Sequence, residues 1–190
     1  MNSDNKGTHK ISMSLGQNKS ASGKNLIYAG ELLVKALKKG NKVLSCGNGG
    51  SASDAQHFTA ELLGRFKTDR PPLPAICLNC NSSVLTAIAN DYGYEKVFSR
   101  QIEAFGSSGD VLIALSTSGN SPNIIEAIRA ALQKEMVVIG FTGIDGGDMK
   151  EFCHVCIRAP EMTTPKIQEW HIKALHLLCA QIEGEIFCKK

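Results

Sequence analysis

The chain has 190 residues, of which 43% are hydrophobic and 21% are charged, and its formal net charge is +3. This length suits one domain with a substantial core, and the composition excludes collagen-like, coiled-coil and wholly disordered chains. No apolar run approaches the roughly 20 residues of a membrane span, and Met1–Gly7 lacks the apolar core of a signal peptide. We therefore expect a cytoplasmic protein. Its small positive charge is spread along the chain, which predicts no nucleic-acid partner and no membrane partner.

The chain begins with a polar stretch. Residues 1–24 are rich in Asn, Ser, Gly and Lys, and we expect a tail, or an arm that a partner orders. A single domain would then span residues 25–190. From Leu26 onward, apolar residues recur with helical spacing, and Gly40 provides a typical stop for that helix.

After Gly40, short apolar runs alternate with amphipathic stretches. The runs are continuously apolar, which is typical of strands buried on both faces of a parallel sheet. With right-handed crossovers, the pattern predicts a doubly wound α/β fold whose five parallel strands follow the flavodoxin-like order 2-1-3-4-5, with helices on both faces. The predicted strands cover residues 42–46, 75–78, 111–115, 136–141 and 155–158. The predicted helices run from the turn after the first strand to about residue 66, and over residues 83–89, 96–104, 121–133 and 165–187.

The seven cysteines include two C-x-x-C pairs, Cys77 with Cys80 and Cys153 with Cys156. Such pairs can bind zinc. Here they overlap apolar runs predicted to be strands, in which side chains three residues apart point to opposite faces of the sheet. Buried reduced thiols are therefore the favoured interpretation, with a cysteine zinc site as the alternative.

The turn after the first predicted strand is rich in glycine. In doubly wound folds, ligands bind beyond the carboxyl ends of the strands. The turn reads Gly-Asn-Gly-Gly-Ser-Ala-Ser-Asp over residues 47–54, and its glycines allow a close approach to a ligand. Ser51 is predicted to cap the following helix, in a weak capping box with Asp54. A tight structural turn is the alternative explanation of the glycines.

The turn after the third strand gathers hydroxyl groups at the start of a helix. It reads Ser-Thr-Ser-Gly-Asn-Ser-Pro over residues 116–122, with Ser121 as the predicted N-cap and Pro122 as the first helical residue. Backbone N–H groups and the helix dipole favour an anion there. Because the loop has no Lys or Arg, it suits a phosphate monoester better than a triphosphate. A solvated turn is the alternative.

These two turns resemble those of the sugar-isomerase (SIS) domain family, and more narrowly those of its bacterial phosphoheptose isomerases. Residues 57–66, 90–94 and 167–171 are also similar, within a resemblance that runs from about residue 26 to 186. It implies an aldose–ketose isomerase that converts sedoheptulose 7-phosphate to D-glycero-D-manno-heptose 7-phosphate through an enediol, the first step of heptose biosynthesis for lipopolysaccharide or capsule. The implied substrate contacts come from Asn48, Gly49, Gly50, Ser51, Glu61, Asn90, Asp91, Ser116, Thr117, Ser118, Ser121 and Gln168.

The resemblance also implies one zinc ion per subunit, held by His57, Glu61, Gln168 and His176. His57 and Glu61 are four residues apart, so they share one helix face. Gln168 and His176 lie about 80° apart around a second helix. Spacing alone is weak evidence, because a surface pair and a core histidine give the same pattern. Glu61 is the candidate base and His176 the partner acid or base, whereas His171 is about 140° from His176 and is expected to be structural.

The family implies a homotetramer with sites at subunit interfaces, although residues 1–24 depart from its amphipathic first helix. Strands one and five would lie about 14 Å apart, so we expect the last helix to complete a neighbouring subunit's site. Two other functions stay open: a non-catalytic SIS protein that binds the replication-initiator protein, and a regulatory SIS domain that senses a sugar phosphate. Glu61 together with His176 favours the enzyme over the first. The chain length leaves no room for the DNA-binding domain that usually accompanies the second.

Overall fold

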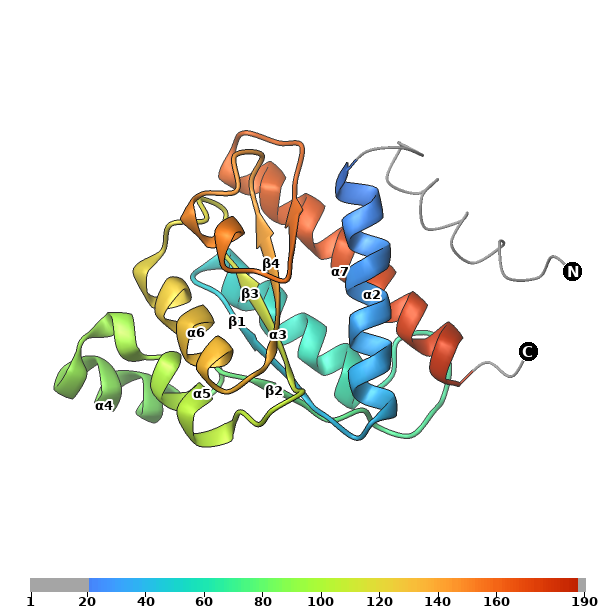
Figure 1. Cartoon of the computed structure of the whole chain (residues 1–190), viewed down its shortest axis with the longest axis horizontal. Helices are drawn as coiled ribbons and strands as arrows, with labels where there is room; N and C mark the ends of the chain where they lie inside the picture. Colours follow the sequence, from blue (N-terminus) through green and yellow to red (C-terminus); the bar gives the residue numbers. More distant parts are fainter. Residues whose placement is uncertain (1–20, 188–190) are drawn as a thin grey trace, which may run out of the picture.

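A computed structural model describes residues 21–187. Helices and strands alternate along the chain, and two short 3₁₀ helices interrupt the pattern (Figure 1). The elements are α2 Ala21–Lys38, β1 Val43–Cys46, α3 Gly50–Leu63, β2 Ala75–Cys77, α4 Ser82–Tyr92, η1 Tyr94–Lys96, α5 Ser99–Phe105, β3 Val111–Leu115, α6 Pro122–Gln133, β4 Val137–Thr142, η2 Asp148–Glu151, β5 Val155–Arg158 and α7 Thr164–Ile186.

The five strands form one parallel sheet in the order β2-β1-β3-β4-β5, which confirms the predicted topology. Strand β1 lies between β2 and β3, pairing Val43 with Ala75 on one side and with Val111 on the other. The connection that leaves β1 and the one that leaves β3 therefore run in opposite directions across the sheet. The turns after these two strands lie side by side, where such folds place their ligands.

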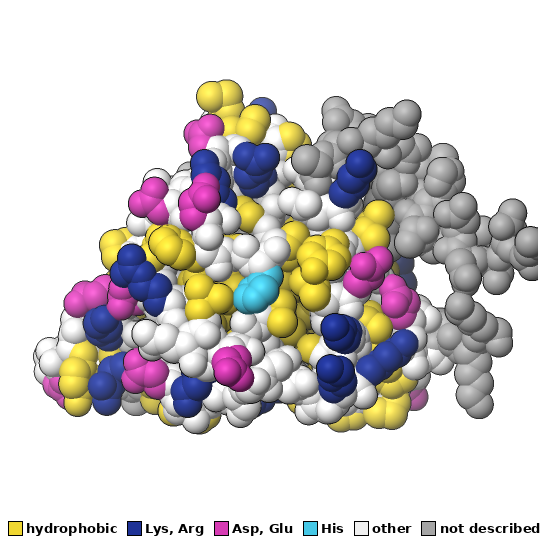
Figure 2. Space-filling view, viewed as in Figure 1, with side chains coloured by type: hydrophobic (Ala, Val, Ile, Leu, Met, Phe, Trp, Pro, Cys, Tyr) yellow, Lys and Arg dark blue, Asp and Glu magenta, His cyan; other side chains and the backbone are white. Residues whose placement is uncertain are grey.

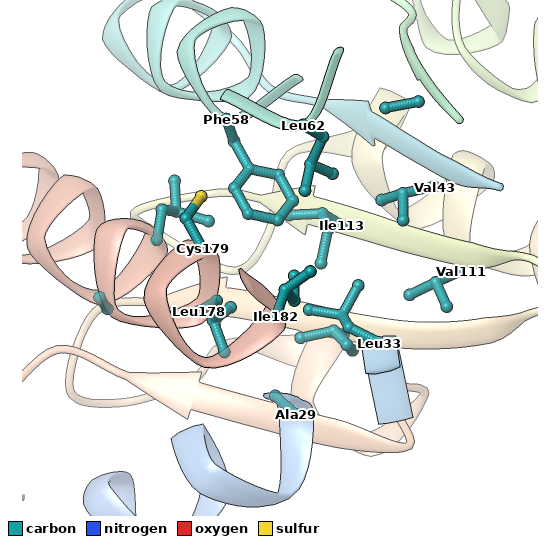
Figure 3. Packing of buried hydrophobic residues seen from close by; sticks show 14 of the residues in the cluster. Ala29, Leu33, Val43, Phe58, Leu62, Val111, Ile113, Leu178, Cys179 and Ile182 are labelled. Carbon is teal, nitrogen blue, oxygen red and sulfur yellow. The ribbon is translucent and has the colours of Figure 1, made fainter. Parts of the chain in front are cut away.

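Alternate strand residues enter two separate cores. Val111, Ile113 and Leu115 face a layer made by α2, α3 and α7, whereas Leu112 and Ala114 face the layer of α5 and α6. Figure 3 shows the first core, to which α3 contributes Phe58, α7 contributes Cys179 and α2 contributes Leu33 over the strands. Covering both faces explains why the strands read as continuous apolar runs.

Helix α7 packs between α2 and α3 in the first layer. Contacts join α7 to both neighbours. Helix α2 occupies the place over β5, where Ser22 Oγ donates to Arg158 O at 2.8 Å and the Asn25 amide donates to Cys156 O at 2.9 Å. Because that place is filled, α7 lies further back across the sheet, next to α3. In Figure 1, α2 and α7 both run from upper left to lower right, α2 more steeply.

Several predicted boundaries differ from the structure. Helix α2 begins at Ala21, so the last part of the predicted polar arm is helical, and residues 1–20 lie outside the described part of the chain. Helix α3 ends at Leu63 instead of Phe66, because Gly64 closes it with a hydrogen bond from its N–H to Ala60 O. The predicted Ser51 cap is wrong: Gly49, with φ of 55°, stands at the N-cap, and Ser51 is buried in the first turn.

The cysteines confirm the favoured interpretation only in part. Six are free thiols among the described residues; Cys46 is buried, but Cys80 is exposed, so the expectation of burial is wrong there. Burial raises the pKa of Cys77 to about 11 and that of Cys153 to about 12, which keeps both thiols protonated at neutral pH. The candidate metal-binding group found among residues 21–187 contains no cysteine.

The surface carries charges of both signs. Figure 2 shows acidic and basic side chains interspersed with hydrophobic ones over the visible face. None of the helices in the described part of the chain combines the length and the apolar composition that a membrane span requires.

Candidate active site

The serine turn, residues 116–122, forms a compact hydroxyl cluster between β3 and α6. Ser116 Oγ lies 3.0 Å from Ser121 Oγ and 3.4 Å from Ser118 Oγ, and it accepts a hydrogen bond from the N–H of Gly119. Gly119 has φ of 70°, a conformation that glycine adopts without strain. Ser121 occupies the N-cap position and Pro122 the helix start, as predicted, but the Ser121 hydroxyl bonds to Ser116 instead of to the helix backbone.

A cavity of about 350 Å³ adjoins this turn. It extends from the serine turn to the loops after β4 and β5 and to the start of α7. These loops carry no recognisable motif, so no role was predicted for them from the sequence. The cavity is lined by Thr117, Ser118, Gly143, Ile144, Asp145, Gly146, Glu161, Met162, Thr164 and Ile167.

Asn48 connects the glycine turn to the opposite half of the fold. It exchanges two amide hydrogen bonds with Asn123, at 2.9 and 2.8 Å, and its Oδ1 also accepts from the Tyr94 hydroxyl at 3.1 Å. Asn123 lies in the first turn of α6, next to the serine turn. The Asn48 side chain thus uses its hydrogen bonds to hold the two turns together. The exposed residues at the start of the glycine turn are Gly49 and Gly50.

Asn79, which follows β2 and has no role predicted from the sequence, fixes the same turn. Its amide donates to Gly47 O at 2.9 Å, and its Oδ1 accepts from the Gly47 N–H at 3.2 Å. Asn79 therefore holds the backbone of the glycine turn, while Asn123 holds the side chain of Asn48. A pre-formed turn of this kind loses less conformational entropy when a ligand binds.

Two imidazoles and a carboxylate meet where α3 packs on α7. His57 Nε2 lies 2.8 Å from His176 Nε2 and 3.2 Å from Glu61 Oε1. One ligand atom from each residue lies within 4.8 Å of the others. Burial, the neighbouring His57 and Lys67 lower the pKa of His176, against the opposing effect of Glu61, so the neutral ring is favoured at pH 7. Neutral imidazoles and a carboxylate are the donors that zinc prefers, so this group fits such an ion.

These three residues come from a single chain, which corrects the argument from strand spacing. We expected α7 to reach the site of a neighbouring subunit because β1 and β5 are not adjacent. Helix α7 instead lies beside α3 of its own chain, so His176 meets His57 and Glu61 in cis. The distance between two strands does not limit the helices, which can pack side by side wherever the layer has room.

Gln168 lies at the other end of the α3–α7 contact. A Cβ on Gly50 would stand 2.6 Å from the Gln168 amide nitrogen and oxygen, so the amide lies beside this glycine. Gly50 precedes His57 by two turns, about 10 Å along the helix. Gln168 therefore borders the glycine turn, where a substrate contact suits it, and its role as a fourth metal ligand stays a prediction.

Asn90 and Asp91 are exposed near the end of α4, where the Asn90 amide donates to the Asp91 carboxylate at 2.8 Å. Figure 1 places α4 at the opposite side of the molecule from α2 and α7. No hydrogen bond among the described residues joins either side chain to the two turns. The structure therefore does not bring these two predicted substrate residues to the histidine pair of the same chain.

Two further ionisable residues stand near the site. His171 is fully buried, and its Nε2 lies 3.0 Å from Thr142 O, in agreement with the structural role predicted for it. Asp54 lies one turn before His57 and has a buried Oδ2 without a hydrogen-bond partner among the described residues. Burial raises the pKa of Asp54 to about 6, and His57 partly offsets this rise.

Comparison with known proteins gives consistent results. Residues 8–143 match the model of the SIS domain. The phosphoheptose isomerase of Shewanella halifaxensis is 54% identical over 162 residues, which cover 84% of this chain and 82% of that protein. Among solved structures, phosphoheptose isomerase GmhA from Neisseria gonorrhoeae is similar with a TM-score of 0.83 and 41% identity, and a phosphoheptose isomerase from Francisella tularensis with a TM-score of 0.84 and 37% identity. Each of these two matches covers 93% of both chains.

Proposed function

The chain belongs to the phosphoheptose isomerases of the SIS-domain family, and we propose that it converts sedoheptulose 7-phosphate to D-glycero-D-manno-heptose 7-phosphate. The observation that carries this proposal is the group of Glu61, His57 and His176. A protein that only binds a sugar phosphate, or another protein, has no need for a carboxylate held against two imidazoles. The product would feed heptose biosynthesis for lipopolysaccharide or capsule, in the cytoplasm.

The serine turn binds the phosphate in this proposal. The hydroxyls of Ser116, Thr117, Ser118 and Ser121, together with N–H groups at the start of α6, supply hydrogen bonds without a fixed cation. The sugar then extends toward Gly49, Gly50 and Ser51, with the Gln168 amide beside it. Anchoring the phosphate away from the reacting carbons orients C1 and C2 for proton transfer.

Aldose–ketose isomerisation moves one proton between C1 and C2 and a second between their oxygens. Glu61 takes the carbon-bound proton and returns it to the neighbouring carbon, so its carboxylate acts as base and then as acid. His176, whose neutral form is favoured, exchanges the proton of the oxygens. We assign His57, Glu61 and His176, with Gln168 as the candidate fourth ligand, to one zinc ion, which when bound would stabilise negative charge on the C1 and C2 oxygens.

We further propose a homotetramer in which the neighbour contributes Asn90 and Asp91. Helix α4 has no buried residue; its last residue, Tyr92, is 53% exposed, and Tyr94, which follows it in η1, is 58% exposed. Packing of α4 on a second copy would bury this surface. It would also explain how Asn90 and Asp91 could act on substrate although they lie far from α7 of their own chain.

The decisive experiment follows proton exchange at C2 of sedoheptulose 7-phosphate in deuterated water. Glu61→Gln should abolish exchange and isomerisation while sugar-phosphate binding stays within about threefold, because the phosphate contacts are untouched. Chelator treatment of the wild type should lower the rate, and added zinc should restore it.

Glu103→Gln serves as the matched control, since Glu103 is an exposed carboxylate on α5. It should retain wild-type exchange. Wild-type exchange by Glu61→Gln would contradict the assignment of the base. A wild-type protein that binds the substrate without any exchange would favour the non-catalytic SIS protein.

A further inference from the structure

A buried ion pair lies next to the histidine pair. Arg70 Nε donates to Glu183 Oε1 at 3.1 Å, and the two side chains are 2% and 5% exposed. Burying two charges costs desolvation energy, so such a pair is weak evidence for a stabilising role. Its other hydrogen bonds indicate what it contributes here.

Arg70 closes the end of α3. Its Nη2 donates to Glu61 O at 2.7 Å, and its Nη1 donates to Leu62 O at 2.9 Å. The last carbonyl groups of a helix have no partner within the helix. The Arg70 guanidinium supplies partners for them, and one of these carbonyls belongs to the proposed base.

Glu183 holds the loop that follows α3. Its carboxylate accepts from the backbone N–H groups of Phe66 and Lys67 at 3.0 Å each, and from that of Thr68 at 3.3 Å. Burial by itself would raise the pKa of Glu183, but these donors and Arg70 outweigh it and lower the pKa. The carboxylate is therefore ionised at neutral pH and joins the loop to α7.

The loop touches the site through Phe66. The Phe66 ring stacks on the His176 ring, with centroids 5.5 Å apart and planes 26° apart. His176 precedes Glu183 by seven residues, so both lie on one face of α7. The ion pair thus ties α3, its following loop and α7 together, two turns beyond the contact between His57 and His176.

We propose that Arg70 and Glu183 are positioning residues that set the register between α3 and α7, and so hold His176 against His57 and Glu61. Apolar packing between the helices is non-directional. It therefore restricts the position of one helix along the other less strictly than a set of hydrogen bonds does. The expected effect on the reaction rests on the proposed function. The positions of the two helices and of His176 can be tested without substrate.

The test compares Glu183→Gln and Arg70→Lys with the control Asp110→Asn. Asp110 is also a buried carboxylate, 2% exposed, that accepts from the N–H groups of Lys42 and Ser107 and pairs with the Lys42 ammonium. It precedes β3, at the end of the sheet opposite to the two turns. The control therefore loses a comparable hydrogen-bonded charge far from the site.

The first readout is the affinity for Co²⁺ alone, followed by visible absorption without substrate. Glu183→Gln and Arg70→Lys should bind Co²⁺ about tenfold more weakly, the range typical of residues that orient metal ligands. In the isomerase assay, kcat should fall about tenfold while KM stays within about twofold, because the serine turn is held separately. Asp110→Asn should lose thermal stability but keep its Co²⁺ affinity and kcat.

The second readout is the NMR spectrum of the histidine rings in the metal-free protein. The His176 ring protons sense the ring current of Phe66, and their signals should move in both variants but not in Asp110→Asn. Unchanged His176 signals and Co²⁺ affinity in a folded Glu183→Gln protein would overturn the proposal, as would equal changes in Asp110→Asn. If neither variant folds, Phe66→Leu must show the same losses of Co²⁺ affinity and of kcat, and wild-type values of both would overturn the proposal. A wild type without isomerase activity would refute the proposed function alone, since the Co²⁺ affinity and the NMR spectrum are measured without substrate.

Discussion

His171 shows how burial turns a titratable side chain into part of the framework. Its Nε2 donates to Thr142 O, because a carbonyl can only accept, and its Nδ1 has no partner among the described residues. The ring contacts Phe141 and Trp170 edge-on. Burial lowers the pKa of His171 from 6.5 to about 4, against a smaller opposing effect of the hydrogen bond. The folded protein therefore keeps this ring neutral under conditions in which the unfolded chain protonates it.

Stability should consequently fall on acidification from pH 6.5 toward pH 4. In this window the unfolded state binds more protons at His171, so the free energy of unfolding decreases as the pH falls, by roughly 3 kcal/mol at most. Urea unfolding at pH 7 and pH 4.5 tests this. His171→Gln should be less stable than the wild type at pH 7 and should lose less on acidification.

The comparison between variants is essential because Asp54 acts in the opposite sense. Its pKa is raised to about 6, so protonation of Asp54 favours the folded state over part of the same range. An equal loss in the wild type and in His171→Gln would show that His171 does not titrate as the buried geometry implies.

At the scale of elements, the sequence predicted the components of the site better than their arrangement. The apolar runs located the strands and the serine turn located the start of α6, because both are local patterns, and the strand order followed from the rules of doubly wound folds. The register of α3 on α7 depends on Arg70 and Glu183, which are distant in sequence. Glu183 follows Leu175 and Cys179 at four-residue spacing on one side of α7, and this position was the available signal, but nothing local identifies its partner. The Phe66 contact with His176 was missed for the same reason.

Gly50→Ala should separate stability from substrate binding. The new Cβ would stand 2.6 Å from the Gln168 amide, the end of a flexible side chain that can move away. Alanine favours a helix over glycine by about 0.5–1 kcal/mol, so thermal stability should not fall. Loss of the Gln168 contact should raise KM about 2- to 12-fold, as expected for one hydrogen bond of 0.5–1.5 kcal/mol.

Gly184→Ala is the control, since a Cβ there meets nothing within 4 Å and the residue also lies in a helix. It should be as stable as Gly50→Ala and keep the wild-type KM. An unchanged KM in Gly50→Ala, measured beside this control, would show that Gln168 does not contact the substrate.

At the scale of the whole molecule, the proposed tetramer predicts which mixtures of inactive subunits regain activity. Mixing Glu61→Gln with His176→Ala subunits should restore no activity, because both residues serve the same group within one chain. Mixing Glu61→Gln with Asp91→Ala should restore part of it, because the first subunit can lend its intact Asp91 to the intact histidine pair of the second. Activity is measured after mass spectrometry has confirmed subunit exchange. Restored activity in the first mixture would refute this arrangement. If Asp91→Ala is inactive alone, a lack of restored activity in the second mixture would refute it too.

The position of α7 between α2 and α3 also bears on how the protein is made. Until α7 leaves the ribosome, the nascent chain has all five strands but only part of one covering layer. The face that carries Ile113 and Phe141 would then stay open between α2 and α3, although these side chains are fully buried in the finished protein. Exposed apolar surface of this kind promotes aggregation and attracts chaperones. The helix that brings His176 into place is thus also the one that ends this vulnerable interval of synthesis.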